Sequence, residues 1–452
     1  MPFNREERTE KLKEILDADE TIGLKPVMGT EMKVYKIPLD YLIFNKENGR
    51  IRTQVKTWES LNKRELNQEE YEEDFNLIAK FIWESKEGAN KKTTKNLKER
   101  NQEVAGEVTA DGVVVGGNRR LRCLMEANIS SMKCVILPEK AGENVARLLT
   151  LEKTLQNTVE GIVDYGPNEK YLECLDMVRA FGGEKKNDGK WLISDECFKK
   201  INESNPDRYK SKHKIHGDLK ILEMMENYLE ETGNPGCYAL LNDKEDYFID
   251  LASSYEIYLN NTEGYTEDGW NPTRSDVSTW VRMCHAVIKA GFQGGKNETK
   301  QYRKLLKKGT KGDQGRNSFF GHREAFHQLK EDFEKEIFPI FDKIKTLDEV
   351  SNMGDVDPIE QCITEEENFK KEVDGKLVGF FNIADRKLQE RTDEGFVERQ
   401  LLNVWSSLKS ISFDENLESW PPKTDNFEEL KDLANKIRQK SAEVYKELKK
   451  IK

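Results

Sequence analysis

The sequence predicts an α+β protein in which a small mixed α/β unit precedes a long helical region. Short apolar or β-branched runs typical of strands occur near residues 33–37, 113–115 and 134–137, and a glycine pair directly follows the middle run. Beyond residue 165 the apolar residues recur mainly at helical spacing. We therefore expect one mixed sheet near the N-terminus and helices in the rest of the chain.

The chain has 452 residues, enough for about two to four domains with cores of their own. The charge pattern, the turn signals and the apolar spacing predict five segments. These are an N-terminal helix in 1–29, an α/β domain in 30–150, a helical domain in 151–232, a second helical domain in 233–350 and a C-terminal helical region in 351–452.

Composition excludes several classes of protein. The net charge of −11 excludes general electrostatic attraction to nucleic acid, so a DNA contact requires a local basic patch. Seven cysteines occur singly and none forms a C-x-x-C pair, which predicts free thiols in a reducing compartment. No stretch approaches the roughly 18 apolar residues of a membrane span, and residues 1–20 form a charged helix without a signal-peptide core. We expect a cytoplasmic protein with no membrane partner.

The segment Asp111–Leu137 carries the clearest signal for function. Its valines predict a strand, the glycines predict a turn that residues with a Cβ would resist, and the next residues predict a helix that begins with arginines. This turn and helix start contain Gly116, Gly117, Asn118, Arg119, Arg120 and Arg122. Backbone N–H groups at such a helix start attract anions, and guanidinium groups add paired donors for phosphate oxygens. The segment therefore predicts a phosphate site, with an arginine-rich surface helix paired to the chain's carboxylates as the alternative.

The residues Gly117–Cys123, which read GNRRLRC, also resemble a family motif. They are similar to the phosphate-binding G-E-R-R-x-R-A motif of ParB proteins, with Asn118 in place of Glu and Cys123 in place of Ala. Sulfiredoxins read G-G-C-H-R at this position, and Asn118 occupies the place of their catalytic cysteine, so we do not expect their reaction. The resemblance to the ParB/sulfiredoxin superfamily implies that the glycine turn and its arginines bind the phosphates of a nucleotide.

A polar turn upstream resembles the first conserved box of ParB proteins. An apolar element, Leu39–Phe44, runs into the turn Asn45–Ile51, and Asn45, Asn48 and Arg50 match the polar positions of the family's N-P-x-x-x-R turn. The resemblance implies that these three side chains close over the nucleotide. Ordinary turn chemistry is the alternative explanation for the same residues.

The region between these two boxes predicts a helix and a loop. Residues Asn67–Glu84 carry Tyr71, Phe75 and Ile82 at helical spacing. The segment Ala89–Arg100, which reads ANKKTTKNLKER, is basic and poor in apolar residues, and we expect a solvated loop or insertion. An acidic partner lying against this segment is the alternative.

A third box departs from the ParB pattern. The helix predicted over 143–157 ends in LEKTLQN, where ParB proteins have E-N-x-Q-R, whose Glu and Asn serve the magnesium and the triphosphate. The alignment gives Thr154, Gln156 and Asn157 as nucleotide contacts and Thr154 as a magnesium ligand. The implied cofactor is a nucleoside triphosphate, CTP or ATP, with Mg²⁺. Lys153 replaces the family's Glu, which leaves hydrolysis open.

A basic helix start further along resembles the second helix of the ParB helix-turn-helix. Ser194 is the predicted N-cap of the first helix. The second helix begins near Lys210–Ile215, where the resemblance assigns DNA contacts to Ser211, Lys212, His213 and Lys214. A helical hairpin with a solvated basic side is the alternative.

The second half of the chain carries no motif that predicts a reaction. Residues 304–316 form a basic segment expected to be a solvated, flexible glycine loop, with a loop that grips a nucleic-acid backbone as the alternative. The last helix places Leu430, Leu433, Ile437, Val444, Leu448 and Ile451 at helical spacing. This helix is interpreted either as a docked helix or as a short coiled-coil seam of a homodimer.

Together these residues predict a nucleotide-dependent, DNA-associated protein of ParB-like type. The resemblance is compatible with bacterial or phage partition, mobile-element or defence roles. One alternative is an ATP-dependent enzyme of the same fold: an ATPase, a nuclease or a small-molecule kinase. The other is an interaction scaffold whose nucleotide site has degenerated.

Overall fold

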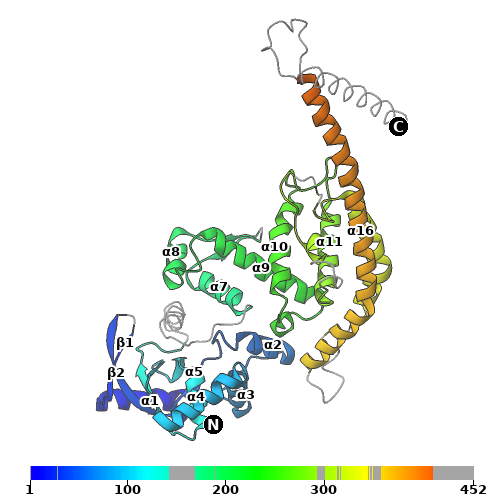
Figure 1. Cartoon of the computed structure of the whole chain (residues 1–452). Coiled ribbons are helices and arrows are strands. Elements are labelled where there is room, and N and C mark those ends of the chain that lie inside the picture. The colour runs from blue at the N-terminus through cyan, green and yellow to red at the C-terminus, as the bar shows by residue number, and fades with distance from the viewer. Residues whose placement is uncertain are drawn as a thin grey trace, which may run out of the picture.

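The computed structural model describes residues 2–27, 29–141, 168–187, 189–292, 301–312, 317–344 and 358–410, with single positions 315, 346 and 349, and side chains up to residue 388. It confirms the predicted α+β class: a small sheet with helices forms the N-terminal part, and helices form the rest. Figure 1 shows the sheet part beside a larger helical part, with the long helix α16 (Pro358–Ser410) along one side of the helical part.

The N-terminal part is built on a mixed six-stranded sheet in the order β1-β2-β6-β4-β5-β3. Its strands are β1 (Gly23–Val27), β2 (Thr30–Pro38), β3 (Ile43–Phe44), β4 (Gly106–Val108), β5 (Val113–Gly116) and β6 (Ser131–Ile136). The pairs β4–β6 and β3–β5 are parallel and the others are antiparallel. The three strands predicted from the sequence correspond to β2, β5 and β6. The strands β1, β3 and β4 were not predicted, because each is short and gains its partner through tertiary pairing.

Five helices belong to this part. They are α1 (Arg5–Ala18), α2 (Arg52–Asn62), α3 (Glu72–Glu84), α4 (Glu87–Arg100) and α5 (Asn118–Glu126). Helices α3 and α5 place Phe75, Ile78, Leu121 and Leu124 in one core with the inward side chains of the sheet. The predicted helices in 1–20 and 67–84 and after the glycine pair are confirmed.

The expectation of a solvated loop over Ala89–Arg100 is wrong, because this segment forms α4. The helix buries Asn90, Thr94 and Leu97, which lie four and three residues apart and therefore share one side. Leu97 is the one strongly apolar residue among them, so the hydrophobic signal in the sequence is weak. Packing against α5 supplies the stabilisation that the sequence pattern does not show.

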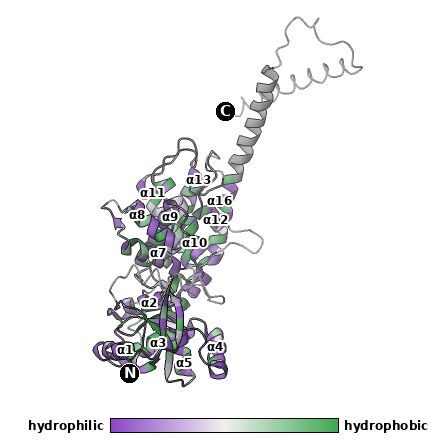
Figure 2. Cartoon of the chain, turned by 90° about the vertical axis from the view of Figure 1, so that its left-hand side faces the viewer, coloured by the Kyte–Doolittle hydropathy of each residue, from purple (hydrophilic) through white to green (hydrophobic). Residues whose placement is uncertain are grey.

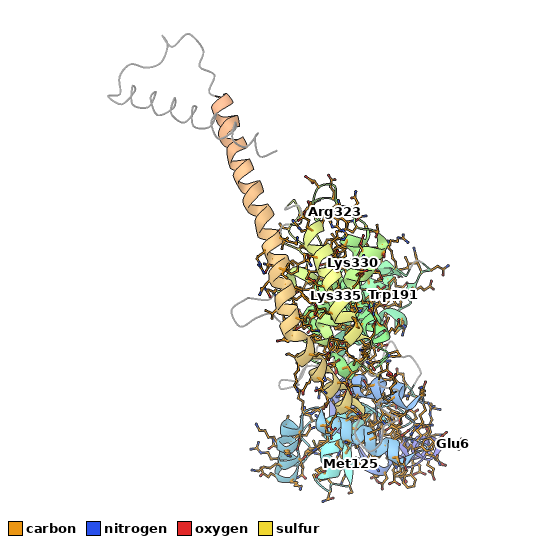
Figure 3. The ribbon with its side chains drawn as sticks, turned by 90° about the vertical axis from the view of Figure 1, so that its right-hand side faces the viewer. Glu6, Met125, Trp191, Arg323, Lys330 and Lys335 are labelled. Carbon is orange, nitrogen blue, oxygen red and sulfur yellow. The ribbon has the colours of Figure 1, made fainter. Side chains whose placement is uncertain are left out.

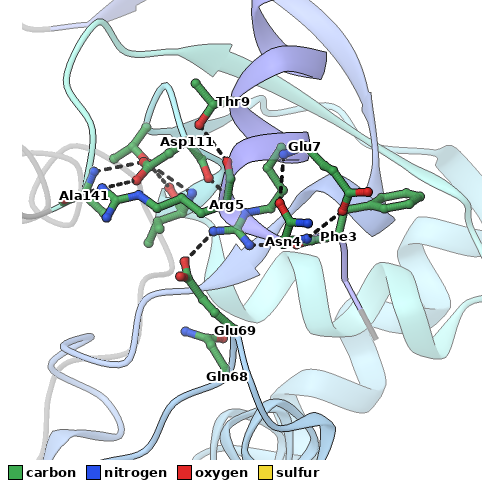
Figure 4. Close-up of polar contacts among 12 residues, drawn as sticks. Phe3, Asn4, Arg5, Glu7, Thr9, Gln68, Glu69, Asp111 and Ala141 are labelled. Atoms are coloured by element: carbon green, nitrogen blue, oxygen red, sulfur yellow. Dashed lines mark hydrogen bonds and ion pairs between the residues drawn. The ribbon is translucent and has the colours of Figure 1, made fainter.

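The N-terminal helix α1 is tied to the turn that precedes β5 (Figure 4). A capping box at Asn4 begins the helix. Arg8 is fully buried and donates to the backbone oxygens of Phe3, at 2.8 Å, and Asp111, at 2.9 Å, as well as to the carboxylate of Glu69, at 2.5 Å. Arg5 forms an ion pair with the Asp111 carboxylate at 2.7 Å. The first helix therefore holds the start of the β5–α5 unit in place.

The helical part has a single continuous core. Its helices are α7 (Glu169–Ala180), α8 (Asp195–Ser204), α9 (Lys212–Glu231), α10 (Glu245–Leu259), α11 (Arg274–Lys289), α12 (Tyr302–Leu306), α13 (Arg323–Asp332), α14 (Phe338–Phe341) and α16, with a π-helical turn at Phe333–Ile337 and a hairpin of β7 (Glu184–Lys185) and β8 (Trp191–Leu192). Buried residues from Tyr171 to Leu388 form one cluster. Segments on both sides of positions 232 and 350 therefore share a core.

Helix α2 joins the two parts. Its Arg52 pairs with Asp176 of α7, and the Thr53 hydroxyl donates to Glu169 at 2.8 Å, where burial raises the pKa of the Glu169 carboxyl. The Thr57 hydroxyl accepts from the Ala239 N–H at 3.1 Å. The turn Asn45–Ile51 thus leads directly into the helix that contacts the helical part. Within the described ranges, no helix is long and apolar enough to cross a membrane.

Candidate phosphate-binding site

Parallel pairing of β3 with β5 brings the two predicted boxes of the α/β part together. Ile43 pairs with Val113 and Phe44 with Val114, so both strands end at the same edge of the sheet. Asn45 follows β3, and the glycine turn follows β5. The two turns are joined directly, since the Asn45 N–H donates to the side-chain oxygen of Asn118 at 2.9 Å.

The glycine turn requires glycine and leaves the start of α5 uncapped. Gly117 is the N-cap residue and has φ 107°, a left-handed conformation that side chains disfavour. A Cβ on Gly117 would lie 2.9 Å from the Met132 side chain, and a Cβ on Gly106 would lie 2.8 Å from the Gly116 oxygen. No side chain caps the helix, so its first N–H groups are available to an anion.

Asn118 connects the two turns through its side chain. It is 3% exposed; its amide nitrogen donates to the Val114 oxygen at 2.8 Å, while its amide oxygen accepts from Asn45. The side chain is therefore engaged in holding the β3 and β5 ends together. Because that side chain is occupied, the predicted phosphate contact from this turn falls to the backbone of Gly116, Gly117 and Asn118.

The three arginines of the motif point in different directions. Arg119 Nε donates to the Asn90 side-chain oxygen on α4 at 2.8 Å. Arg122 pairs with Glu126 at 3.0 Å and lies over the Trp83 ring, 5.0 Å from its centroid. Arg120 instead turns back to the glycine turn, with Nη1 3.4 Å from the position that a Cβ on Gly117 would take. Arg120 is thus the arginine nearest the uncapped helix start.

Arg120 is a cation without a polar partner among the residues that the structure describes. Burial lowers the pKa of its guanidinium, and the attraction of Glu107 opposes that shift. Glu107 is itself 2% exposed and forms an ion pair with Lys25, and burial raises the pKa of the Glu107 carboxyl. Two cations therefore share one buried carboxylate at this edge of the sheet. A phosphate group would supply the missing negative charge.

Sequence reasoning missed Glu107 and Lys25. Glu107 lies on the short strand β4 and Lys25 on β1, where Lys25 Nζ also donates to the Ala105 oxygen at 2.6 Å. Each is an isolated charged residue in a segment with no recognisable motif, so no signal in the sequence connects them with the arginine helix. The sheet pairing places them there.

The polar residues of the upstream turn shape its own backbone. The Asn45 side-chain oxygen accepts from the Glu47 N–H at 3.0 Å, and the Asn48 side-chain oxygen accepts from the Arg50 N–H at 3.1 Å. Such side-chain turns are a structural use of asparagine. The contacts of Asn45, Asn48 and Arg50 with a nucleotide stay a prediction.

The third box lies outside the described residues. This applies to Thr154, Gln156 and Asn157, and therefore to the predicted magnesium ligand. In the ranges that are described, no group of three or more His, Cys, Asp or Glu side chains has the arrangement of a metal site.

The predicted DNA-contacting residues occupy the start of α9. Ser211 is the N-cap and accepts from the Lys214 N–H at 3.4 Å, while His213 is exposed. Lys212 pairs with Asp195 at 2.7 Å, and Lys214 pairs with the buried Asp218 at 2.9 Å. Residues 205–211 connect α8 to α9, a longer link than the usual turn of about three or four residues. The DNA contacts remain a prediction.

The basic segment 304–316 differs from its expectation. Its first residues belong to α12, and the cations there are paired: Lys304 with Asp385 at 2.5 Å and Lys307 with Asp250 at 3.3 Å. The prediction of a flexible loop is therefore wrong for these first residues, because carboxylates of α10 and α16 form ion pairs with their lysines. The predicted dimer helix, with Leu430 to Ile451, lies outside the described residues.

Comparison with known proteins gives matches among solved structures. No protein-family model and no curated protein matches the chain. Four chains among solved structures match, and one of them is described as the C2221 form of a Pnob8-like ParB-N domain. The similarity has a TM-score of 0.31 and 10% sequence identity, and it covers 57% of this chain and 92% of that one. At this TM-score the similarity carries no argument about this chain.

Proposed function

We propose that this protein binds a nucleoside triphosphate at the β5–α5 turn and acts as a nucleotide-dependent, DNA-associated protein of ParB-like type. The observation that carries the proposal is the position of Arg120. Its guanidinium lies beside Gly117 at an uncapped helix start, and it has no hydrogen-bond or ion-pair partner among the described residues. A phosphate there would accept charge-assisted hydrogen bonds from Arg120 and from the first N–H groups of α5.

The other predicted residues would take secondary roles. Arg119 and Arg122 would exchange Asn90 and Glu126 for phosphate oxygens, and the turn with Asn45, Asn48 and Arg50 would close over the nucleotide. Thr154, Gln156 and Asn157 would add contacts to the triphosphate and to Mg²⁺. If hydrolysis occurs, it would proceed by positioning and charge neutralisation, and we assign no general base.

The test is calorimetric binding of ATP, CTP, GTP and UTP with Mg²⁺, each with and without duplex DNA. We expect one nucleotide to bind, Arg120→Gln to abolish binding, and Arg122→Gln to weaken it much less. Arg122 is a matched comparison because it lies on the same helix, has a secondary role at the phosphate and is paired with Glu126. Absence of binding by every nucleotide would favour the scaffold, whereas ATP turnover that requires serine or DNA would favour the enzyme.

The DNA part of the proposal rests on the exposed start of α9, with Ser211 and His213 facing solvent. A Lys212→Gln/Lys214→Gln variant should bind duplex DNA more weakly. The slope of its log affinity against log salt concentration should be smaller in magnitude by roughly two. Unchanged affinity and salt dependence would remove α9 from the DNA contact.

A further inference from the structure

Helix α4 carries an unusual concentration of positive charge. Residues 86–100 contain six lysines or arginines and two glutamates, whereas the whole chain has 73 basic and 84 acidic residues. The basic residues are Lys86, Lys91, Lys92, Lys95, Lys98 and Arg100. A segment with a formal charge of +4 therefore lies within a chain of net charge −11.

The basic residues of α4 face outward. Asn90, Thr94 and Leu97 are buried on the inner side, and all six cations are exposed. Figure 2 shows α4 at the outer edge of the N-terminal part, with hydrophilic residues along much of its length. The helix is held from inside by the Arg119–Asn90 hydrogen bond, so the outer cations are not needed to dock it.

In the part of the chain that the structure describes, no neighbouring element forms an ion pair with these cations. Lys91 pairs with Glu87 at 2.5 Å and Lys95 with Glu99 at 3.9 Å, both within the helix. Lys92, Lys98 and Arg100 have no ion pair with any residue in the described part of the chain.

Two other basic segments among the described residues are different. At the start of α9, Lys212 pairs with Asp195 and Lys214 with Asp218. At α12, Lys304 pairs with Asp385. Carboxylates from other elements or from the buried side of the same helix therefore hold these cations, and of these three described segments α4 is the one whose charge is left to the solvent side.

We propose that the outer side of α4 binds the sugar-phosphate backbone of a nucleic acid. A regular polyanion is the partner that suits several adjacent cations, since each phosphate contact also releases condensed counterions. None of the exposed large apolar side chains of the described residues belongs to α4, so this side lacks the apolar face with which helices enter a membrane surface.

The length of the basic side suits this partner. From Lys91 to Arg100 the helix rises about 14 Å. Along each strand, duplex DNA carries one charge per roughly 3.4 Å of axis, so one strand presents about four phosphates over this length. One strand therefore offers enough phosphates for a contact with each of Lys92, Lys98 and Arg100.

This surface is separate from the glycine turn. Arg119 connects α5 to α4, whereas Arg120, the next residue, turns toward Gly117. Nucleic acid on α4 and a phosphate at the turn would therefore use different side chains of the same domain, and variants can separate them.

The experiment measures binding of the full-length chain to a fluorescent duplex DNA and to a single-stranded RNA of equal length, over about 50 to 200 mM salt. The test variant is Lys92→Gln/Lys98→Gln/Arg100→Gln. The control, Arg323→Gln/Lys335→Gln/Lys371→Gln, makes the same charge change on exposed residues of the helical part. Arg323 and Lys335 lie there, far from the end of the molecule that carries Glu6 and Met125 (Figure 3).

We expect the α4 variant to lower the magnitude of the slope of log affinity against log salt by about two to three and to weaken binding about tenfold. The larger loss, with DNA or with RNA, identifies which of the two nucleic acids α4 binds. The control should behave as the unaltered protein. Equal behaviour of the two variants, or no binding of the unaltered protein to either nucleic acid, overturns the proposal. Glutamine retains helix propensity, and circular dichroism checks that α4 persists. These titrations are run without nucleotide, and nucleotide binding is measured separately by calorimetry, so failure of the nucleotide proposal would be recognised separately.

Discussion

Replacing Arg120 should stabilise the protein while removing its phosphate site. Arg120→Met keeps a long flexible side chain but removes a charge that burial penalises and that has no polar partner among the described residues. Replacing buried ion pairs or triads by well-packed apolar residues is often neutral or stabilising by about 1–4 kcal/mol, and here Glu107 keeps its other cation, Lys25. Because Arg120 is only partly buried, we expect a gain near the lower end, about 1 kcal/mol in the free energy of unfolding.

The matched change at Arg122 should have the opposite sign. Arg122→Met loses the pair with Glu126, which is about half-exposed and contributes about 0.3–0.5 kcal/mol, and the contact with the Trp83 ring, which contributes about 0.5–1 kcal/mol. We therefore expect destabilisation by about 1 kcal/mol. Two arginines two residues apart on one helix thus give opposite changes, because Arg122 has an ion-pair partner and Arg120 has none among the described residues.

The assay is urea unfolding followed by tryptophan fluorescence, since Trp58 and Trp83 lie in the N-terminal part. It is repeated with the nucleotide at about one hundred times its dissociation constant, which should stabilise the unaltered protein by about 2.7 kcal/mol and leave Arg120→Met unchanged. The order of stability of these two proteins then reverses. Destabilisation by Arg120→Met without nucleotide, or an equal gain from nucleotide in both proteins, would refute the assignment.

Three further changes test the fold around the site. Arg8→Met should cost about 3 kcal/mol in urea unfolding, because it removes a fully buried guanidinium from three acceptors, whereas Lys33→Met, whose pair with Asp19 is exposed on both sides, should change stability far less. Gly117→Ala should destabilise the protein by at least about 1–2 kcal/mol because φ is 107°. Gly88→Ala, inside α4 with open space around it, should stabilise it by about 0.5–1 kcal/mol. Thermal melts that shift the midpoint in the same direction for both variants would contradict the turn geometry. Burial raises the pKa of the Glu169 carboxyl in the folded state, so the folded protein binds that proton more tightly than the unfolded chain does. The free energy of unfolding therefore falls as the pH rises above the ordinary value of 4.5. Glu169→Gln should remove this loss at pH 7, and an unchanged pH profile of unfolding would contradict the burial of this carboxyl.

The element around the glycine turn could be predicted because its signals are local. A β-branched run, a glycine pair and a 3.6-residue period each act over a few residues, and β5, the turn and α5 follow them. The same reasoning failed for α4. Two of its three buried residues are Asn90 and Thr94, so polar side chains occupy the positions where the pattern needs apolar ones.

The direction of each arginine could not be predicted. The sequence shows Arg119, Arg120 and Arg122 as equivalent members of one motif, and side chains at adjacent helix positions differ by about 100° in direction. Which neighbour each one meets depends on where α4, α3 and β4 are packed. These elements supply Asn90 to the first, Trp83 to the third and the buried Glu107 near the second.

The sequence by itself determined the α+β class, the β5–turn–α5 unit and the presence of positive charge at a helix start, because backbone conformation at glycine and apolar periodicity are short-range properties. Only the tertiary structure decided that the Asn45 turn meets Asn118 and that Arg120 is the arginine left without a partner among the described residues. It also decided that the cations of α4 face solvent. Those outcomes depend on contacts between residues far apart in the chain, such as Asn45 with Asn118, and no local pattern encodes which charged groups such contacts will bring together.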